Sequence, residues 1–131
     1  MIEAAFLLSL FLHRDLALVR AVYEIGGIDA VAVVEMESRF NPTACRREPD
    51  GSSFGLWQLY DKYHDQHRNN LYQHIITGAA FLEECKVRAG GDFVRAVSLY
   101  NSGSMTKNRK WGERVKRERN RLEWWLLRRM R

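Results

Sequence analysis

The chain has 131 residues, of which 46% are apolar, and it carries a formal net charge of +5 at pH 7. This length suits one domain with a core of its own, and the apolar content excludes an intrinsically disordered chain. The charge is uneven. Residues 1–106 carry 10 Lys/Arg against 13 Asp/Glu, a net of −3, whereas residues 107–131 carry 11 against 3, a net of +8. The basic character therefore belongs to the C-terminal end.

The N-terminal apolar run Ala4–Leu12 is too short to span a bilayer. Glu3 precedes it and a polar His-Arg-Asp tripeptide follows it, which does not fit the basic start and small-residue cleavage site of a signal peptide. We therefore expect a core helix, with a secretion signal as the alternative. The two cysteines, Cys45 and Cys85, are too few for a disulfide scaffold, and free thiols in a reducing compartment are favoured over a bridge.

The first third of the chain predicts two helices. The first spans residues 3–25, and its apolar positions recur at helical spacing at Leu16, Val19, Val22 and Tyr23. Gly26-Gly27 ends it, and Asp29 caps a second helix that runs to about Arg39. Asn41-Pro42 breaks this second helix.

The middle of the chain is less regular. Residues 43–54 are polar and predict a loop, an apolar stretch follows at Phe54–Tyr60, and a polar surface loop then extends to about residue 70. Strands fit only as a short irregular hairpin within residues 43–60. The predicted fold class is therefore all-α, with at most that short hairpin.

Helices return in the second half. Residues 71–88 predict a helix with an apolar stripe at Ile75, Ala79, Leu82 and Cys85. Asp92 caps a further helix over residues 93–103. No internal repeat interrupts the chain, so we expect a single domain over residues 1–131 that closes with a long basic helix at about residues 107–131.

That last helix is amphipathic, because its apolar residues fall on one side, at Trp111, Val115, Leu122, Trp125, Leu126 and Met130. Three interpretations stay open. The segment is a core helix with a solvated charged face, or a contact for anionic membrane lipid or lipopolysaccharide, or a docking surface for a partner protein or nucleic acid. Nucleic acid is the least favoured of these partners.

Two glutamates, Glu35 and Glu37, end an otherwise apolar run. On a helical wheel they lie about 200° apart, so they cannot share a face as an acid/base pair. A glutamate in an apolar pocket has a raised pKa and can serve as a general acid near neutral pH. The alternative is that both are capping or ion-paired residues, and the helical wheel does not choose between them.

Four segments together resemble the lytic transglycosylases of the lysozyme-like superfamily, which include the soluble lytic transglycosylases and the goose-type-lysozyme-like domains. In chain order they are Glu37-Ser38-Arg39-Phe40-Asn41-Pro42, Gly55-Leu56-Trp57-Gln58, the helix positions Ile75, Gly78 and Leu82, and Leu99-Tyr100-Asn101-Ser102-Gly103. The resemblance covers roughly residues 15–117. Trp57 departs from the usual Met, and Ser98 and Ser102 stand where Ala is usual, which puts substrate preference rather than reaction class in doubt.

The resemblance implies that Glu37 is the catalytic residue and the single acid/base. It would protonate the bond between N-acetylmuramic acid and N-acetylglucosamine in peptidoglycan, and then deprotonate the muramic 6-hydroxyl to close a 1,6-anhydro ring. Ser38 would orient the carboxylate, Gln58 would bind the neighbouring sugar, and Tyr100 and Asn101 would line the cleft. Core packing is the alternative for Tyr100. No cofactor and no metal are implied.

Glycosidases more often use two carboxylates. At the position where animal-type lysozymes carry a second acid this chain has Ser53, and Glu48 and Asp50 lie nearby but out of register. This favours the transglycosylase outcome. A hydrolytic muramidase stays open if a shifted loop brings Asp50 in, and a catalytically inactive glycan-binding or structural virion protein is the third interpretation.

His64, His67 and His74 match no zinc-binding spacing, and we expect solvated loop histidines. Without a clear signal peptide, an enzyme that acts on periplasmic peptidoglycan suggests a bacteriophage protein. It would be carried in the virion to open the wall, where virion proteins would be its partners, or be released from the host cytoplasm for lysis. A bacterial secretion-system enzyme is the alternative.

Overall fold

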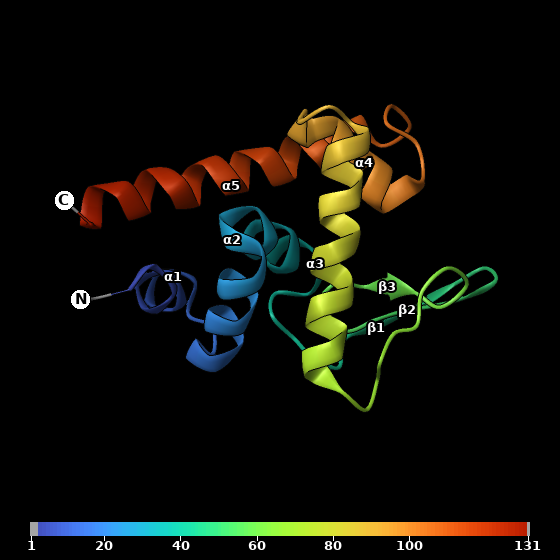
Figure 1. Cartoon of the computed structure of the whole chain (residues 1–131), viewed down its shortest axis with the longest axis horizontal. Coiled ribbons are helices and arrows are strands. Elements are labelled where there is room, and N and C mark those ends of the chain that lie inside the picture. Colours follow the sequence, from blue (N-terminus) through green and yellow to red (C-terminus); the bar gives the residue numbers. More distant parts are fainter. Residues whose placement is uncertain (1–2, 131) are drawn as a thin grey trace.

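The computed structural model describes residues 3–130, and within them it shows five helices and one three-stranded sheet (Figure 1). In chain order these are α1 (Ala4–Leu12), α2 (Leu16–Ser38), β1 (Cys45–Glu48), β2 (Gly51–Phe54), β3 (Leu59–Tyr60), α3 (Leu71–Arg88), α4 (Phe93–Ser102) and α5 (Arg109–Arg129). The predicted all-α class with a short hairpin is confirmed.

The predicted helix over residues 3–25 is wrong, because the chain turns between α1 and α2. His13 takes a left-handed conformation with φ 57° at the end of α1. The carboxylate of Asp15 then accepts a hydrogen bond from the Leu18 amide at 3.0 Å and caps α2. The polar tripeptide after Leu12 is therefore a helix boundary.

The predicted boundary at Gly26-Gly27 is a kink within α2. Gly27 has φ 70° and ψ −164°, which a residue with a side chain rarely adopts, and helix continues on both sides of it. Asp29 does not start a new helix as expected. Its carboxylate instead lies 2.7 Å from Nε of Arg119 and 2.8 Å from Nζ of Lys86, so it ties α2 to α5 and α3.

The second half of α2 forms the centre of the core. Residues 30–34 (AVAVV) are fully buried around the whole helix. Figure 1 shows α2 between α5 and α1 on one side and α3 on the other. A helix that is apolar all round is a buried helix, which is why the two glutamates at its end have an unusual setting.

The sheet is an antiparallel hairpin with a short third strand, in the order β1-β2-β3. Arg46 pairs with Ser53 and Glu48 with Gly51 in its register. The loop that follows is not wholly at the surface, because Gln66 is buried and its amide nitrogen donates to the carbonyls of Ser52 at 2.8 Å and Leu59 at 2.7 Å. The loop therefore folds back against the sheet and is anchored to it through Gln66.

The helices of the second half agree with their predicted spans. Asn70 caps α3, and Asp92 caps α4 by accepting from the Arg95 amide at 3.1 Å. In α5 the buried positions include Val115, Leu122 and Leu126. Met130 was predicted to lie on the apolar side of this helix. It instead directly follows α5 and is 47% exposed.

His74 is not a solvated loop residue as expected. It lies on α3 with 1% exposure, and its two ring nitrogens lie 2.8 Å from the Gln66 carbonyl and 3.2 Å from the Trp57 amide. Cys45 is an exposed free thiol on β1, and Cys85 is a buried free thiol on α3. Among the helices described, none combines the length and the apolar character that crossing a bilayer requires.

Candidate active site

Glu37 occupies the last turn of the buried helix α2, directly before the chain reverses. Arg39 ends the helix with φ 52°, and Phe40 follows with φ 60° and inserts its ring into the core with 4% exposure. The anchored ring directs the chain from α2 into the hairpin. The carboxylate of Glu37 therefore lies where α2, the hairpin and the last two helices meet.

The neighbouring glutamate has a different role. The guanidinium of Arg14 forms a two-pronged ion pair with Glu35, with Nε and Nη2 at 2.9 and 2.8 Å from its two oxygens. Both oxygens of Glu35 are thereby satisfied. The expectation that Glu35 is an ion-pair partner is confirmed.

Glu37 is the opposite case, because its Oε2 is buried and makes no hydrogen bond within the described residues. Burial raises the pKa of Glu37 from 4.5 to about 7. The charge of Arg46 and the donors of Trp111 and Asn101 lower this pKa, and the charge of Glu48 raises it. A carboxylic acid with a pKa near 7 can both give and take a proton at neutral pH.

Ser38 joins the end of α2 to the Gly55–Gln58 segment. Its hydroxyl lies 2.9 Å from the Leu56 carbonyl and 3.2 Å from the carbonyl of Val34. Both contacts are to backbone, so Ser38 positions the turn that carries Glu37 and does not hydrogen-bond the carboxylate itself.

Trp57 is fully buried beside α3, where Gly78 makes room for it. A Cβ atom at Gly78 would lie only 2.1 Å from Cγ of the indole. The large residue where Met is usual therefore depends on a glycine of α3. The close packing fixes the segment that precedes Gln58.

Gln58 has a left-handed backbone with φ 51°. Its amide nitrogen donates to the carbonyls of Ala44 at 3.0 Å and Gly55 at 2.9 Å, which holds the side chain against the entry to the hairpin. Its Oε1 is bonded to no described residue, so it can accept a hydrogen bond from a ligand N–H.

Tyr100 and Asn101 approach Glu37 from the end of α4. The hydroxyl of Tyr100 donates to the Trp57 carbonyl at 2.5 Å. Burial and the nearby charge of Glu37 raise the pKa of Tyr100 well above its ordinary value. The side-chain oxygen of Asn101 accepts from the amide of Asn108 at 2.5 Å, which leaves its own N–H₂ group for the carboxylate.

The structure thus brings Tyr100 and Asn101 to Glu37, whereas Ser38 and Gln58 act on the chain around it. The sequence did not single out Trp111 and Arg46. Trp111 was assigned only to the apolar side of the last helix, and the signal for Arg46 was its place in the predicted hairpin.

Asp50 does not approach the site. It lies in the β1–β2 turn with its side chain 71% exposed and its carboxylate 3.8 Å from Nζ of Lys62. The shifted loop that would have supplied a second acid from Asp50 is therefore not formed.

Two surface hollows lie away from Glu37. One of about 200 Å³ lies between Phe54, Arg68 and His74. The other, of about 480 Å³, lies along the outer side of the hairpin near Arg47 and Arg68. Neither includes Glu37, so the candidate chemistry is assigned from the buried carboxylate and not from a surface hollow.

A comparison of the sequence with models of protein families identifies the family of this chain. The model of the transglycosylase SLT domain matches residues 23–123. The chain belongs to this family. Searches of curated proteins and of solved structures gave no significant match.

As a member of the transglycosylase SLT family, the chain is a glycan-cleaving enzyme of the lysozyme-like superfamily whose substrate is peptidoglycan. The matched range includes Glu37 and every residue gathered around it. Within residues 3–130, no three His, Cys, Asp or Glu side chains come together in a group that could hold a metal ion.

Proposed function

We propose that this transglycosylase cleaves the β-1,4 bond between N-acetylmuramic acid and N-acetylglucosamine and releases 1,6-anhydro-muramic acid ends. Glu37 is the single proton-transfer group. The observation that supports this most directly is the buried and unpartnered Oε2 of Glu37, together with its pKa of about 7. An acid with this pKa is about half protonated at neutral pH, so both forms that the reaction needs are populated.

The reaction has two proton transfers. Protonated Glu37 gives its proton to the glycosidic oxygen as the bond to the anomeric carbon breaks. The resulting carboxylate takes the proton of the muramic 6-hydroxyl, whose oxygen bonds to the anomeric carbon and closes the ring. Glu37 ends as it began, and no water is consumed.

The neighbours of Glu37 suit the charged half of this cycle. Trp111 and Asn101 carry N–H donors that favour the carboxylate form. These donors stabilise the carboxylate when the proton has been given away, while burial favours the acid before that step. The unbonded Oε1 of Gln58 is suited to accept the N–H of an N-acetyl group on the sugar next to the cleaved bond.

The test is a digest of purified peptidoglycan sacculi read by mass spectrometry. We expect fragments lighter by one water than the matching reducing-end muropeptides, and their loss in Glu37→Gln. Reducing ends from the wild type would instead indicate a hydrolytic muramidase. A folded wild type that releases no fragments would indicate a glycan-binding or structural protein.

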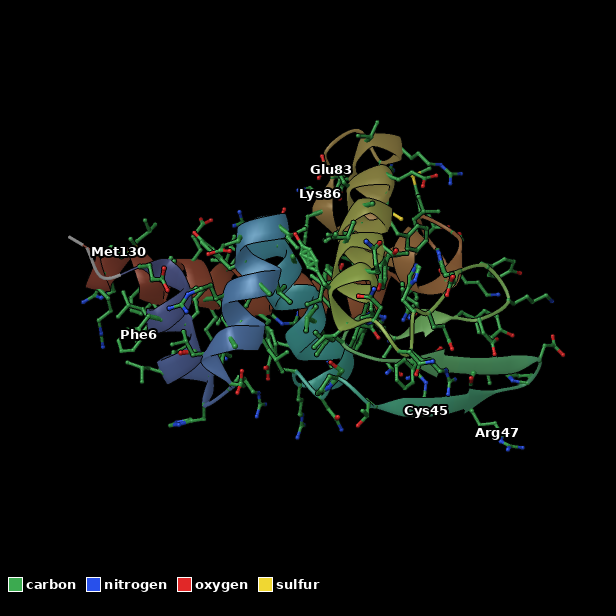
Figure 2. All side chains as sticks on the ribbon, turned by 60° about the horizontal axis from the view of Figure 1, so that its bottom comes forward. Phe6, Cys45, Arg47, Glu83, Lys86 and Met130 are labelled. Atoms are coloured by element: carbon green, nitrogen blue, oxygen red, sulfur yellow. The ribbon has the colours of Figure 1, made fainter. Side chains whose placement is uncertain are left out.

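We further propose that the outer face of α5 contacts an anionic surface, either membrane lipid or lipopolysaccharide. Trp124 and Leu127 are 61% and 60% exposed, and the guanidinium of Arg128 lies 4.6 Å from the centre of the Trp124 ring. Figure 2 shows Phe6 and Met130 at this end of the molecule and the hairpin at the other. Tryptophan and arginine together suit a membrane interface.

Sedimentation with vesicles that contain phosphatidylglycerol, against neutral vesicles, tests this contact. Trp124→Ser with Leu127→Ser should abolish it, and Tyr72→Ser on α3 is the matched control on another exposed face. Absence of binding to anionic vesicles would contradict the contact. The bacteriophage setting rests on the sequence alone and is tested by proteomics of purified virions, where this chain should be present if it is carried into the host.

A further inference from the structure

We propose that a row of cations on the first half of α5 binds the carboxylates of the stem peptides that peptidoglycan carries on its muramic acid residues. The row, called the basic stripe below, consists of Lys110, Arg114 and Arg117. This inference rests on the proposed function, in which the glycan strand is cleaved at Glu37. It adds the part of the substrate beside the strand that the enzyme recognises.

The three side chains of the basic stripe lie on one side of α5. They are separated by four and then three residues, which places them within about 60° of one another on a helical wheel. All three are exposed, and from Lys110 to Arg117 the helix rises by about 10 Å. The stripe is therefore one continuous cationic surface.

The cations of the stripe have no counterions, because no described residue forms an ion pair or a hydrogen bond with their side chains. The neighbouring acids are bound to other arginines of the same helix. Glu113 lies 3.4 Å from Nε of Arg109, and Glu118 accepts Nε and Nη2 of Arg121, both at 2.8 Å. The positive charge of the stripe is thus available to a ligand.

The start of α5 is fixed beside the candidate active site. The side-chain amide of Asn108, directly before the helix, donates to Oδ1 of Asn101 at 2.5 Å. A Cβ atom at Gly112 would lie only 2.4 Å from the carbonyl oxygen of Val94, so the first turn of α5 packs closely on α4. Figure 1 shows α5 starting beside α4 and then extending away along α2 toward α1.

Arg114 connects the stripe to the site. Its guanidinium carbon lies 5.4 Å from the centre of the Trp111 ring. The Nε1 atom of Trp111 is buried, and its N–H is directed at the carboxyl group of Glu37. One indole ring therefore separates the stripe from Glu37, so a strand bound for cleavage at Glu37 has the stripe beside it.

The surroundings of the stripe fit a charged ligand in water and not a lipid bilayer. Within residues 107–120 no large apolar side chain is exposed, whereas a helix that lies in a membrane interface inserts such side chains. On α5 they occur further along, at Trp124 and Leu127. The two halves of the helix therefore have different ligands.

Stem peptides have the complementary chemistry. They branch from the lactyl group of muramic acid, next to the bond that the enzyme cleaves, and they carry carboxylates at their free end and on acidic residues. Guanidinium groups bind carboxylates through two parallel hydrogen bonds, and a lysine adds a point charge. The stripe thus gives the enzyme a preference for glycan strands with charged stems.

The experiment measures binding in the Glu37→Gln protein, which keeps the strand intact. Soluble glycan strands with natural stems are compared with the same strands after their carboxylates have been converted to amides. We expect about 10-fold weaker binding of the amidated strands, since each of three exposed ion contacts contributes a few-fold. Adding Lys110→Gln, Arg114→Gln and Arg117→Gln should weaken binding of the natural strands about 10-fold and remove the preference.

A matched control removes the same charge elsewhere. Arg88→Gln, Arg95→Gln and Lys116→Gln neutralise three exposed cations, of which Lys116 lies on α5 about 130° from the centre of the stripe. This control should keep the 10-fold preference. Salt at about 0.5 M should reduce the preference, because exposed charges are screened. Thermal unfolding should show that both triple variants are folded.

The same contacts have a kinetic signature when Glu37 is intact. The stripe variant should raise KM for natural strands about 10-fold and leave kcat within about 2-fold, because the stems are held equally in the ground state and the transition state. On amidated strands the stripe variant and the wild type should have the same KM.

Three results would overturn the proposal. The first is equal binding of natural and amidated strands by the Glu37→Gln protein, and the second is an equal loss in the control variant, which would mean that only net charge matters. The third is a stripe variant that keeps the preference and no longer sediments with anionic vesicles, which would assign the stripe to the membrane contact. Failure of the proposed function is distinct, since it appears in the products of the wild type, whereas the binding comparison involves no cleavage.

Discussion

Oε2 of Glu37 and Nε1 of Trp111 are both buried, and within the described residues neither makes a hydrogen bond, although the indole lies near enough to lower the pKa of the carboxyl. The two groups come from α2 and α5, which are far apart in the chain. An acid and a donor left unbonded side by side suit a site that must hold a neutral carboxyl group first and a carboxylate afterwards. Helix α5 thus contributes to the candidate active site as well as covering the core.

Replacing Glu37 by Gln should abolish activity and stabilise the fold. We expect a fall in kcat of about 100- to 10,000-fold, since general acid–base catalysis is lost. The pKa of Glu37 is raised in the folded state, so its contribution to stability is present below about pH 4.5 and is lost as the pH rises toward about 7. At higher pH the wild type should be less stable by up to about 3 kcal/mol for this reason.

Urea unfolding of both proteins across this pH range measures the effect. The two free energies of unfolding should diverge from acid to neutral pH, and parallel curves would contradict the raised pKa. Glu35→Gln is the matched control two residues away. It breaks the ion pair with Arg14, so it should lower stability by about 1–2 kcal/mol and leave kcat near the wild-type value.

Replacing Trp111 by Phe keeps an aromatic ring and removes the indole N–H. The pKa of Glu37 should rise, because a donor that favours the charged form is gone. The fall of kcat/KM at high pH should then move to higher pH, and kcat should drop about 10-fold because the carboxylate formed in the reaction is less stabilised. Trp124→Phe, at the exposed end of α5, is the control and should leave the profile in place. An unchanged pH profile of kcat/KM in Trp111→Phe would mean that α5 takes no part in the chemistry.

Gly78→Ala should destabilise the protein by about 2 kcal/mol or more. The added methyl group would lie 2.1 Å from the Trp57 ring, which is fully buried and cannot move aside. The mid-helix alanine itself would otherwise be favourable. Ala80→Ser, on the exposed side of the same helix, is the matched control. Thermal unfolding should show a lower Tm only for Gly78→Ala, and an equal Tm would mean that Trp57 has room.

His74 should make the fold sensitive to acid. Burial lowers its pKa below the ordinary 6.5, which outweighs the bond to the Gln66 carbonyl. The unfolded chain therefore binds a proton before the folded one does, so stability falls as the pH drops below about 6.5. Protonation would also place a second N–H against the Trp57 amide, which now donates to Nε2.

Urea unfolding between about pH 7.5 and pH 5 tests this, with His74→Gln as the variant that cannot titrate. His74→Gln should be less stable at neutral pH and should lose part of the decline toward acid. His13→Asn is the control, because it removes an exposed histidine at a left-handed position that asparagine tolerates. The same decline in wild type and His74→Gln would rule out His74 as its source.

Asp29→Asn should cost about 2 kcal/mol of stability. Burial alone would raise the pKa of Asp29, but the bonds from Lys86 and Arg119 outweigh it and lower the pKa. The carboxylate therefore stabilises the fold above pH 3.8, its ordinary pKa, and loses this effect as the pH falls further. Figure 2 shows Lys86 beside Glu83 on α3, where the Asp29 pair meets that helix.

The control for this variant is Glu123→Gln, which removes a more exposed partner of Arg119 and should cost less than about 0.5 kcal/mol. Guanidinium unfolding of the two variants compares them under one condition. Equal costs for the two would mean that the Asp29 network adds little beyond a surface ion pair.

Local patterns in the sequence accounted for the helices. The spans of α3 and α4, with the cap at Asp92, follow from apolar spacing and capping chemistry that act within a few residues. The same reasoning misplaced the boundary in the N-terminal part. A Gly-Gly pair can end a helix or kink it, and only the packing of the surrounding helices decides which.

In the sequence, Glu37 was a candidate acid because it follows an apolar run and because the surrounding motif resembles that of a known family. The helical wheel alone did not distinguish Glu37 from Glu35. The tertiary structure separated the two, because Arg14 reaches Glu35 and nothing within the described residues reaches Oε2 of Glu37. It also brought Trp111 to the carboxyl group from a helix that lies far away in the chain. Desolvation and charge act through space, so the pKa of a buried carboxyl group depends on residues that no local pattern connects to it.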